Sequence, residues 1–123
     1  MMKPKKGKAA AEDLLRKWQK RLCLQDWHIE LVTGCSPDEM MLENCAGRTD
    51  WTESAKTARI EILDPQYYGD RIKPFDLEKT LVHELLHLKM TFWCQSTERV
   101  EDRLMHQVID DLARALVWRD ENE

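Results

Sequence analysis

Residues 74–93 read PFDLEKTLVHELLHLKMTFW, and the predicted fold is organised around this stretch. Asp76 is placed to cap a helix, because a carboxylate there accepts hydrogen bonds from backbone N–H groups of the first turn. From there onward, apolar residues occupy nearly every side of the predicted helix: Leu77, Leu81, Val82, Leu85, Leu86, Leu88, Phe92 and Trp93. A helix that is apolar nearly all round is a buried one. We therefore expect the rest of the chain to pack around it.

Hydrophobic periodicity predicts five further elements. They are a helix over 9–24, strands over 27–31, 46–52 and 57–63, and a last helix over 97–119 with an apolar stripe of Met105, Ile109, Leu112 and Leu116. Residues 38–45 fit either a short helical turn or a loop. The predicted fold class is therefore α+β, with a small, mostly antiparallel, three-stranded sheet. The 123 residues amount to one domain, and we assign residues 1–8 to a disordered basic tail and 9–123 to that domain.

The composition excludes several classes of protein. Hydrophobic residues make up 42% and charged residues 34%, which is enough apolar material for a core and excludes an intrinsically disordered chain. No apolar run approaches the roughly 18 residues that a membrane helix needs. The N-terminal sequence is basic but lacks the apolar segment of a secretory signal. A cytoplasmic location without a membrane partner is therefore expected.

Charge is distributed unevenly along the chain. Residues 1–21 carry eight Lys or Arg and two Asp or Glu, a balance of +6, whereas residues 22–123 carry eleven and twenty-one, a balance of −10. A negative surface repels phosphate backbones, so the body of the protein is not expected to bind nucleic acid. Only the Lys-rich N-terminal tail could contact such a partner.

The four cysteines do not form a zinc ribbon, since no two of them make a C-x-x-C pair. Without a secretory signal, disulfides are not expected. We predict that Cys23, Cys35, Cys45 and Cys94 are all reduced, and that Cys23 and Cys94 are small core residues.

Residues 83–87 read His83-Glu84-Leu85-Leu86-His87, the H-E-x-x-H pattern. Residues four apart lie on one face of a helix, so both imidazoles can direct a nitrogen at one Zn²⁺ ion. Glu84 lies beside that pair, where it can take a proton from a water on the metal and pass it on. The pattern predicts one zinc ion per chain, held by His83 and His87, with Glu84 as general base.

A catalytic zinc site needs a third protein ligand and one open position. The extended pattern H-E-x-x-H-x-x-G-x-x-H is absent, because Met90 and Trp93 stand where its Gly and last His would be. The third ligand is therefore expected on the last helix.

Helix length narrows the choice of this ligand. About six residues of helix follow His87, so an antiparallel helix that begins near Thr97 returns to its level around residues 102–106. Asp110, one turn after the end of that range, could hydrogen-bond a ligating histidine. We favour His106 as the third ligand, ahead of Asp102, Glu98 and Glu101.

The segment TLVHELLHL, followed by a helix that ends VIDDLARALV, resembles the small gluzincin-type zinc metallopeptidase domains. These are the minigluzincin and SprT-like proteins, many of them encoded by bacteria and prophages. The resemblance covers most of the chain and implies a zincin-like fold that hydrolyses a peptide or protein substrate. In that family the third ligand is a Glu, four residues before an Asp or Asn that supports a zinc histidine. His106 and Asp110 match those positions, with His in place of the family's Glu.

Peptidases of this kind bind an extended substrate along a sheet edge through main-chain hydrogen bonds. Either 46–52 or 57–63 could be that edge strand, and we favour 46–52. Tyr67 and Tyr68 could offer a hydroxyl to the oxyanion of the reaction, but packing on the domain is the simpler interpretation. His28 alternates outward on its strand and is interpreted as a surface residue.

Two other functions are compatible with the same residues. One is a catalytically silent metal-binding regulatory or phage protein, in which a side chain such as Asp102 or Glu98 completes the coordination. The other is a different three-histidine metallohydrolase that acts on RNA or in deformylation. The negative balance of residues 22–123 argues against RNA, and the lack of a suitable cysteine ligand argues against deformylation.

Overall fold

The computed structural model describes residues 6–40, 46–69, 74–91 and 99–122, without the side chains of 6–9 and 99–102. The elements are α1 (Lys6–Arg21), β1 (His28–Cys35), α2 (Pro37–Met40), β2 (Gly47–Thr52), β3 (Thr57–Leu63), the 3-10 helix η1 (Pro65–Tyr67), α3 (Leu77–Lys89) and α5 (Arg99–Glu121). The α+β class predicted from the sequence is confirmed. None of the described helices has both the length and the apolar character required to cross a lipid bilayer.

The three strands form one sheet in the order β1-β3-β2. β2 pairs antiparallel with β3, because a tight turn joins them and the N–H of Lys56 donates to the carbonyl of Glu53 at 3.2 Å. β1 pairs parallel with β3, so the sheet is mixed, where the sequence predicted a mostly antiparallel one. A long segment separates β1 from β2, so no tight turn requires β1 to run antiparallel to its neighbour in the sheet. β2 is therefore an edge strand, as favoured for 46–52.

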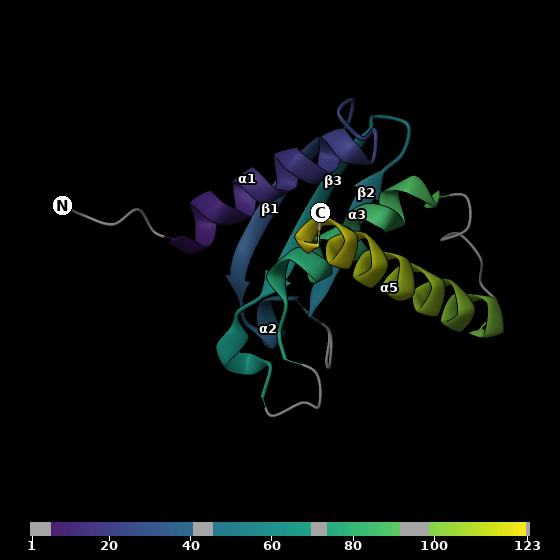
Figure 1. Ribbon diagram of the computed structural model, residues 1–123. Helices are drawn as coiled ribbons and strands as arrows, with labels where there is room; N and C mark the ends of the chain where they lie inside the picture. Colours follow the sequence, from purple (N-terminus) through teal and green to yellow (C-terminus); the bar gives the residue numbers. More distant parts are fainter. Residues whose placement is uncertain (1–5, 41–45, 70–73, 92–98, 123) are drawn as a thin grey trace.

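The helices cover one face of the sheet. α1 and α3 lie against it and α5 packs on α3 (Figure 1). Ala58, Ile60 and Ile62 of β3 face the helices, as their alternation predicts, and all three are buried. Every residue of α3 from Thr80 to Leu88 is buried except His83, so α3 is the central helix that the sequence predicts.

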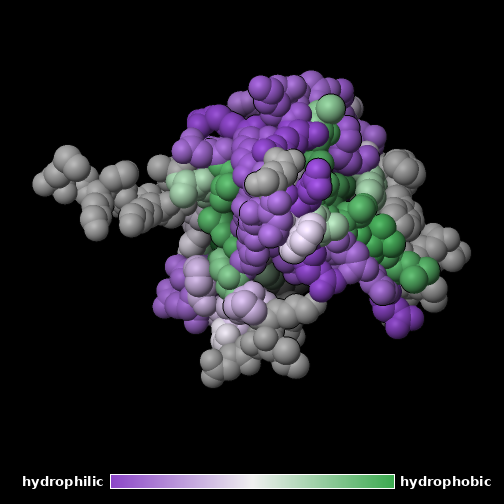
Figure 2. All heavy atoms as spheres, in the orientation of Figure 1, coloured by the Kyte–Doolittle hydropathy of each residue, from purple (hydrophilic) through white to green (hydrophobic). Residues whose placement is uncertain are grey.

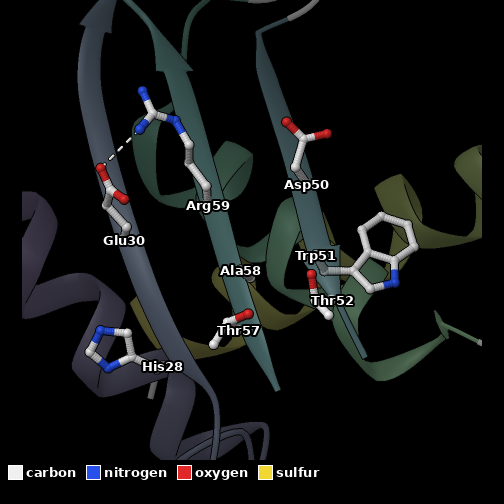
Figure 3. Close-up of a pocket in the computed structure, with 8 residues that line it drawn as sticks. All are labelled: His28, Glu30, Asp50, Trp51, Thr52, Thr57, Ala58 and Arg59. Carbon is white, nitrogen blue, oxygen red and sulfur yellow. Dashed lines mark hydrogen bonds and ion pairs between the residues drawn. The ribbon is translucent and has the colours of Figure 1, made fainter. Parts of the chain in front are cut away.

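The opposite face of the sheet carries charged side chains, and at its end Val32 and Leu63 pack with Met40 of α2 in a small apolar cluster. Arg59 pairs with Glu30 at 2.9 Å, and Arg48 pairs with Glu61 at 3.6 Å. Figure 3 shows His28, Glu30 and Arg59 beside one another on this face, where they line a shallow pocket with residues of β2. Because His28 is exposed here, it is the surface residue that the alternation predicts.

Several predicted boundaries differ from the structure. α1 begins at Lys6 and ends at Arg21, where 9–24 was predicted. The chain then turns through Cys23, whose φ is +57°, so Cys23 is exposed and its prediction as a core residue is wrong. β1 continues through Gly34 to Cys35, beyond the strand predicted over 27–31. Cys94 and residues 1–5 lie outside the described residues.

The apolar stripe of α5 is rotated from the predicted one. The buried residues are Met105, Ile109, Ala113 and Val117. Leu112, predicted in the core, is 39% exposed and joins Leu104 and Val108 on the outer side of the helix. Figure 2 shows this hydrophobic surface along α5. The small side chain of Ala113 suits close packing of α5 on α3, and this favours the observed rotation.

A network of polar side chains connects α1 to α3 and α5. Trp18 Nε1 donates to Glu78 Oε2 at 2.6 Å, and Lys17 Nζ lies 3.1 Å from the same oxygen. Lys17 and Arg21 also pair with Asp120 near the end of α5. The hydrogen bond from Lys17, and then that from Arg21, holds the pKa of Asp120 below its ordinary value.

We predict that this network makes stability depend on pH. A carboxylate whose pKa is lower in the folded than in the unfolded chain stabilises the fold above its unfolded pKa. That stabilisation is lost as the pH falls through the unfolded value of about 4 toward the folded one. Asp120→Asn should therefore lower the free energy of unfolding at pH 7 and flatten its acid dependence, measured by urea denaturation at a series of pH values.

The control is Asp13→Asn on the outer side of α1, whose carboxylate is 81% exposed and pairs with Arg16 at 3.4 Å. Exposed pairs of this kind contribute little to stability, so this variant should unfold like the wild type. Equal acid dependence in Asp120→Asn and the wild type would show that the network does not link the helices energetically.

Candidate metal centre

α3 places His83 and His87 side by side. Asp76 begins the helix as predicted, since its Oδ1 accepts from the N–H of Lys79 at 3.0 Å. One helical turn then separates the two histidines, and their ring centroids lie 5.1 Å apart. His87 is buried and His83 is half-buried, so the pair lies at the margin of the core.

α5 adds the third histidine. The ring of His106 lies 4.8 Å from that of His87 and 6.0 Å from that of His83, centroid to centroid. One ligand nitrogen from each of the three rings can be chosen so that all lie within 4.8 Å of one another. Among the described residues, these form the one group of three potential metal-ligating side chains. The structure thus brings together the three residues that the sequence selects.

This donor set fits a zinc ion. Imidazole nitrogens bind Zn²⁺ at about 2.0–2.1 Å, which places neighbouring nitrogens of a tetrahedral site about 3.3 Å apart. Small changes in side-chain torsions would close the difference from the observed spacing. His106 is exposed, so solvent reaches the cluster from its side.

Burial keeps two of the histidines neutral. It lowers the pKa of His87 to about 3, and the neighbouring His83 and His106 act in the same direction. Burial also lowers the pKa of His83, although Asp110 opposes the shift. Metal binding requires an unprotonated nitrogen, so both rings are ready to bind at neutral pH without first losing a proton.

Asp110 lies behind the histidine cluster. Its Oδ1 is 3.4 Å from Nδ1 of His83 and 2.9 Å from Nζ of Lys79, and Arg114 Nε lies 3.5 Å from Oδ2. Burial acts to raise the pKa of Asp110, but Lys79, His83 and Arg114 together outweigh it and hold the pKa below its ordinary value. The carboxylate therefore stays ionised, and it favours a proton on Nδ1 of His83 and a lone pair on Nε2.

The carboxylate of Glu84 is directed from α3 toward β2. Glu84 is 6% exposed, and its Oε1 accepts a hydrogen bond from the hydroxyl of Thr49 on β2 at 2.7 Å. Burial raises the pKa of Glu84 to about 7, although the hydrogen bond from Thr49 opposes the shift. Gly47, also on β2, permits this approach, because a Cβ there would lie 3.1 Å from Oε2 of Glu84.

Sequence reasoning missed Thr49, Gly47 and Lys79. Nothing in the local pattern links Thr49 or Lys79 to the motif. Gly47 did carry a signal, since glycine inside a strand often marks the close approach of another group. Comparisons with protein-family models, curated proteins and solved structures find no match to this chain.

The other sequence candidates are placed as follows. Glu98 and the side chains of Glu101 and Asp102 lie outside the described residues. Tyr68 packs edge-on against Phe75 with ring centroids 5.4 Å apart, and it contacts the small cluster that contains Cys35. The structure therefore gives Tyr68 the packing role that was the simpler interpretation.

We predict that removing any ligand histidine abolishes tight zinc binding. His83→Ala, His87→Ala and His106→Ala should each weaken zinc affinity by more than about 100-fold, because losing even a supporting residue typically costs about 10- to 100-fold. Competition with a chromophoric chelator measures the affinity, and the wild type should bind one equivalent. His28→Ala is the matched control, since His28 lies on the opposite face of the sheet. Full affinity in His106→Ala would contradict the three-histidine site.

We also predict that Asp110 raises the zinc affinity of this site through its contact with His83. Asp110→Ala removes the acceptor beside His83 Nδ1 and should lower zinc affinity by about 10- to 100-fold. Asp111→Ala, which removes an exposed carboxylate paired with Arg114 on the same helix, should leave the affinity unchanged. The chelator competition applies to both variants, and equal affinities would rule out the supporting role of Asp110.

Proposed function

We propose that this protein is a zinc-dependent metallopeptidase. The observation that carries the proposal is the convergence of three histidines from two helices, with the buried carboxylate of Glu84 on the residue that follows the first of them. The arrangement matches the one implied by the resemblance to minigluzincin and SprT-like domains, except that His106 stands in place of the family's Glu. A zinc ion held by His83, His87 and His106 would polarise the scissile carbonyl and lower the pKa of water to about 7.

Glu84 acts as general base and then as general acid. Its Oε2 takes a proton from the attacking water while the water oxygen bonds to the carbonyl carbon. The same proton passes to the amide nitrogen as the C–N bond breaks, so the carboxylate is regenerated. A pKa near 7 suits a group that must both accept and release a proton at neutral pH.

The supporting residues hold this machinery in place. Asp110 accepts from Nδ1 of His83 and thereby directs Nε2 of that ring toward the other histidines. Burial of His87 keeps its imidazole unprotonated. The proposed ligand set is three neutral side chains, so a bound ion would keep its full positive charge.

The substrate is an extended peptide. β2 is an edge strand that runs beside Glu84, and the described strands leave its outer side unpaired. An extended chain can add to such an edge through main-chain hydrogen bonds. This geometry would present a peptide bond beside Glu84.

The decisive experiment compares wild-type protein with Glu84→Gln on a library of mixed peptides. We expect the wild type to hydrolyse peptides when loaded with zinc, and the variant to lose about 100- to 10,000-fold of that rate because the proton carrier is gone. The variant should keep its zinc affinity, since Glu84 is not a ligand. Glu39→Gln, the same change on an exposed residue of α2, should retain full activity.

Each alternative function has its own outcome in this experiment. Full zinc binding without hydrolysis of any peptide would support a catalytically silent metal-binding protein. Cleavage of RNA but not of peptides, again dependent on Glu84, would assign the site to another metallohydrolase. Either outcome would overturn the peptidase proposal.

A further inference from the structure

Along β2, the main-chain N–H and C=O groups of successive residues point alternately toward β3 and away from it. The N–H of Leu63 donates to the carbonyl of Ala46 at 2.9 Å, so these residues form a hydrogen-bonded pair at the start of the antiparallel ladder. In such a ladder, hydrogen-bonded and non-hydrogen-bonded pairs alternate. The residues whose N–H and C=O groups point away from β3, toward the outer side of the sheet, are therefore Gly47, Thr49 and Trp51.

The side chains of those three residues lie on the face of the sheet that packs against α3. The contact of Thr49 with Glu84 Oε1 at 2.7 Å establishes this orientation. Gly47 lies two residues earlier on the same face of the strand, and its lack of a side chain leaves room for Oε2 of the same carboxylate. One short stretch of edge strand thus contacts the carboxylate through Thr49, and no described strand pairs with its outward-pointing main-chain groups.

The two carboxylate oxygens of Glu84 are in different surroundings. Oε1 accepts the hydrogen bond from the Thr49 hydroxyl, whereas Oε2 lies beside Gly47, where a Cβ atom would be 3.1 Å from it. A carboxylate held by one oxygen cannot rotate about its last torsion without losing that hydrogen bond. In a buried site such a loss is costly, because an unsatisfied carboxylate oxygen is poorly solvated.

We propose that Thr49 is a positioning residue for Glu84: its hydroxyl holds Oε1 so that Oε2 is left to carry the proton, while its own N–H and C=O receive the substrate main chain. This inference rests on the proposed peptidase function and deepens it. Docking of an extended peptide and alignment of the base are then performed by the same residue.

The first test uses Thr49→Val, which keeps the shape of the side chain but removes the hydroxyl, and Thr49→Ser, which keeps the hydroxyl. With zinc-loaded protein and a peptide substrate, Thr49→Val should lower kcat by about 10- to 100-fold, as misplacement of a reacting group does. KM and zinc affinity should change by less than about 3-fold, because substrate backbone contacts and metal ligands remain. Thr49→Ser should recover most of kcat.

The control is Thr57→Val on β3, an exposed threonine on the opposite face of the sheet. It makes the same chemical change on a neighbouring strand and should keep wild-type kcat. An unchanged kcat in Thr49→Val, or a loss in Thr49→Ser equal to that in Thr49→Val, would overturn the positioning role.

The second test needs neither metal nor substrate. In metal-free protein, Thr49→Val should shift the unfolding equilibrium constant about tenfold more when Glu84 is present than in a Glu84→Met background, because the hydrogen bond between the hydroxyl and the buried carboxyl group is lost only in the first case. Additive effects would show that the hydroxyl does not hold the carboxylate.

The two tests separate the two ideas. If the wild type hydrolyses no peptide, the proposed function and the catalytic role of Thr49 both fail, and the metal-free measurement still decides whether the contact with Glu84 exists. If the wild type is active but Thr49→Val retains full kcat, the peptidase proposal stands and the positioning role is wrong.

Discussion

The structure depends on one constraint, which is that α3 must be buried while it carries three polar side chains in its central turns. Its apolar sides contact the sheet, α1 and α5, so its polar groups cannot all turn toward bulk water. They are accommodated by partners on two sides: α5 meets His83 and His87, and β2 meets Glu84. Without those partners each group would lose its hydration and gain nothing in return.

The same burial prepares the chemistry of the site. Low solvent exposure keeps His83 and His87 neutral and raises the pKa of Glu84. Asp110 is paired with Lys79 and Arg114, and its Oδ1 also lies 3.4 Å from Nδ1 of His83. Three imidazoles that converge from two helices are an environment in which a metal ion could be held.

Local periodicity predicted the elements better than their assembly. The strand 57–63, the capping by Asp76 and the burial of α3 follow from side chains that are neighbours in the sequence, and all three were found. The parallel pairing of β1, the exposure of Cys23 and the rotation of α5 toward Ala113 were not predicted. Each of these features depends on which neighbouring element packs against the segment. The pattern of apolar residues within a single helix or strand does not specify that neighbour.

For the site, the sequence by itself determined the relation of His83, Glu84 and His87, because residues one and four apart have a fixed geometry on any α-helix. It also narrowed the third histidine to the level of residue 106, since helix rise converts a count of residues into a length. Only the tertiary structure decided that Thr49 and Gly47 meet Glu84 and that Lys79 pairs with Asp110. Those contacts join segments whose separation along the chain says nothing about distance until the sheet and helices have packed.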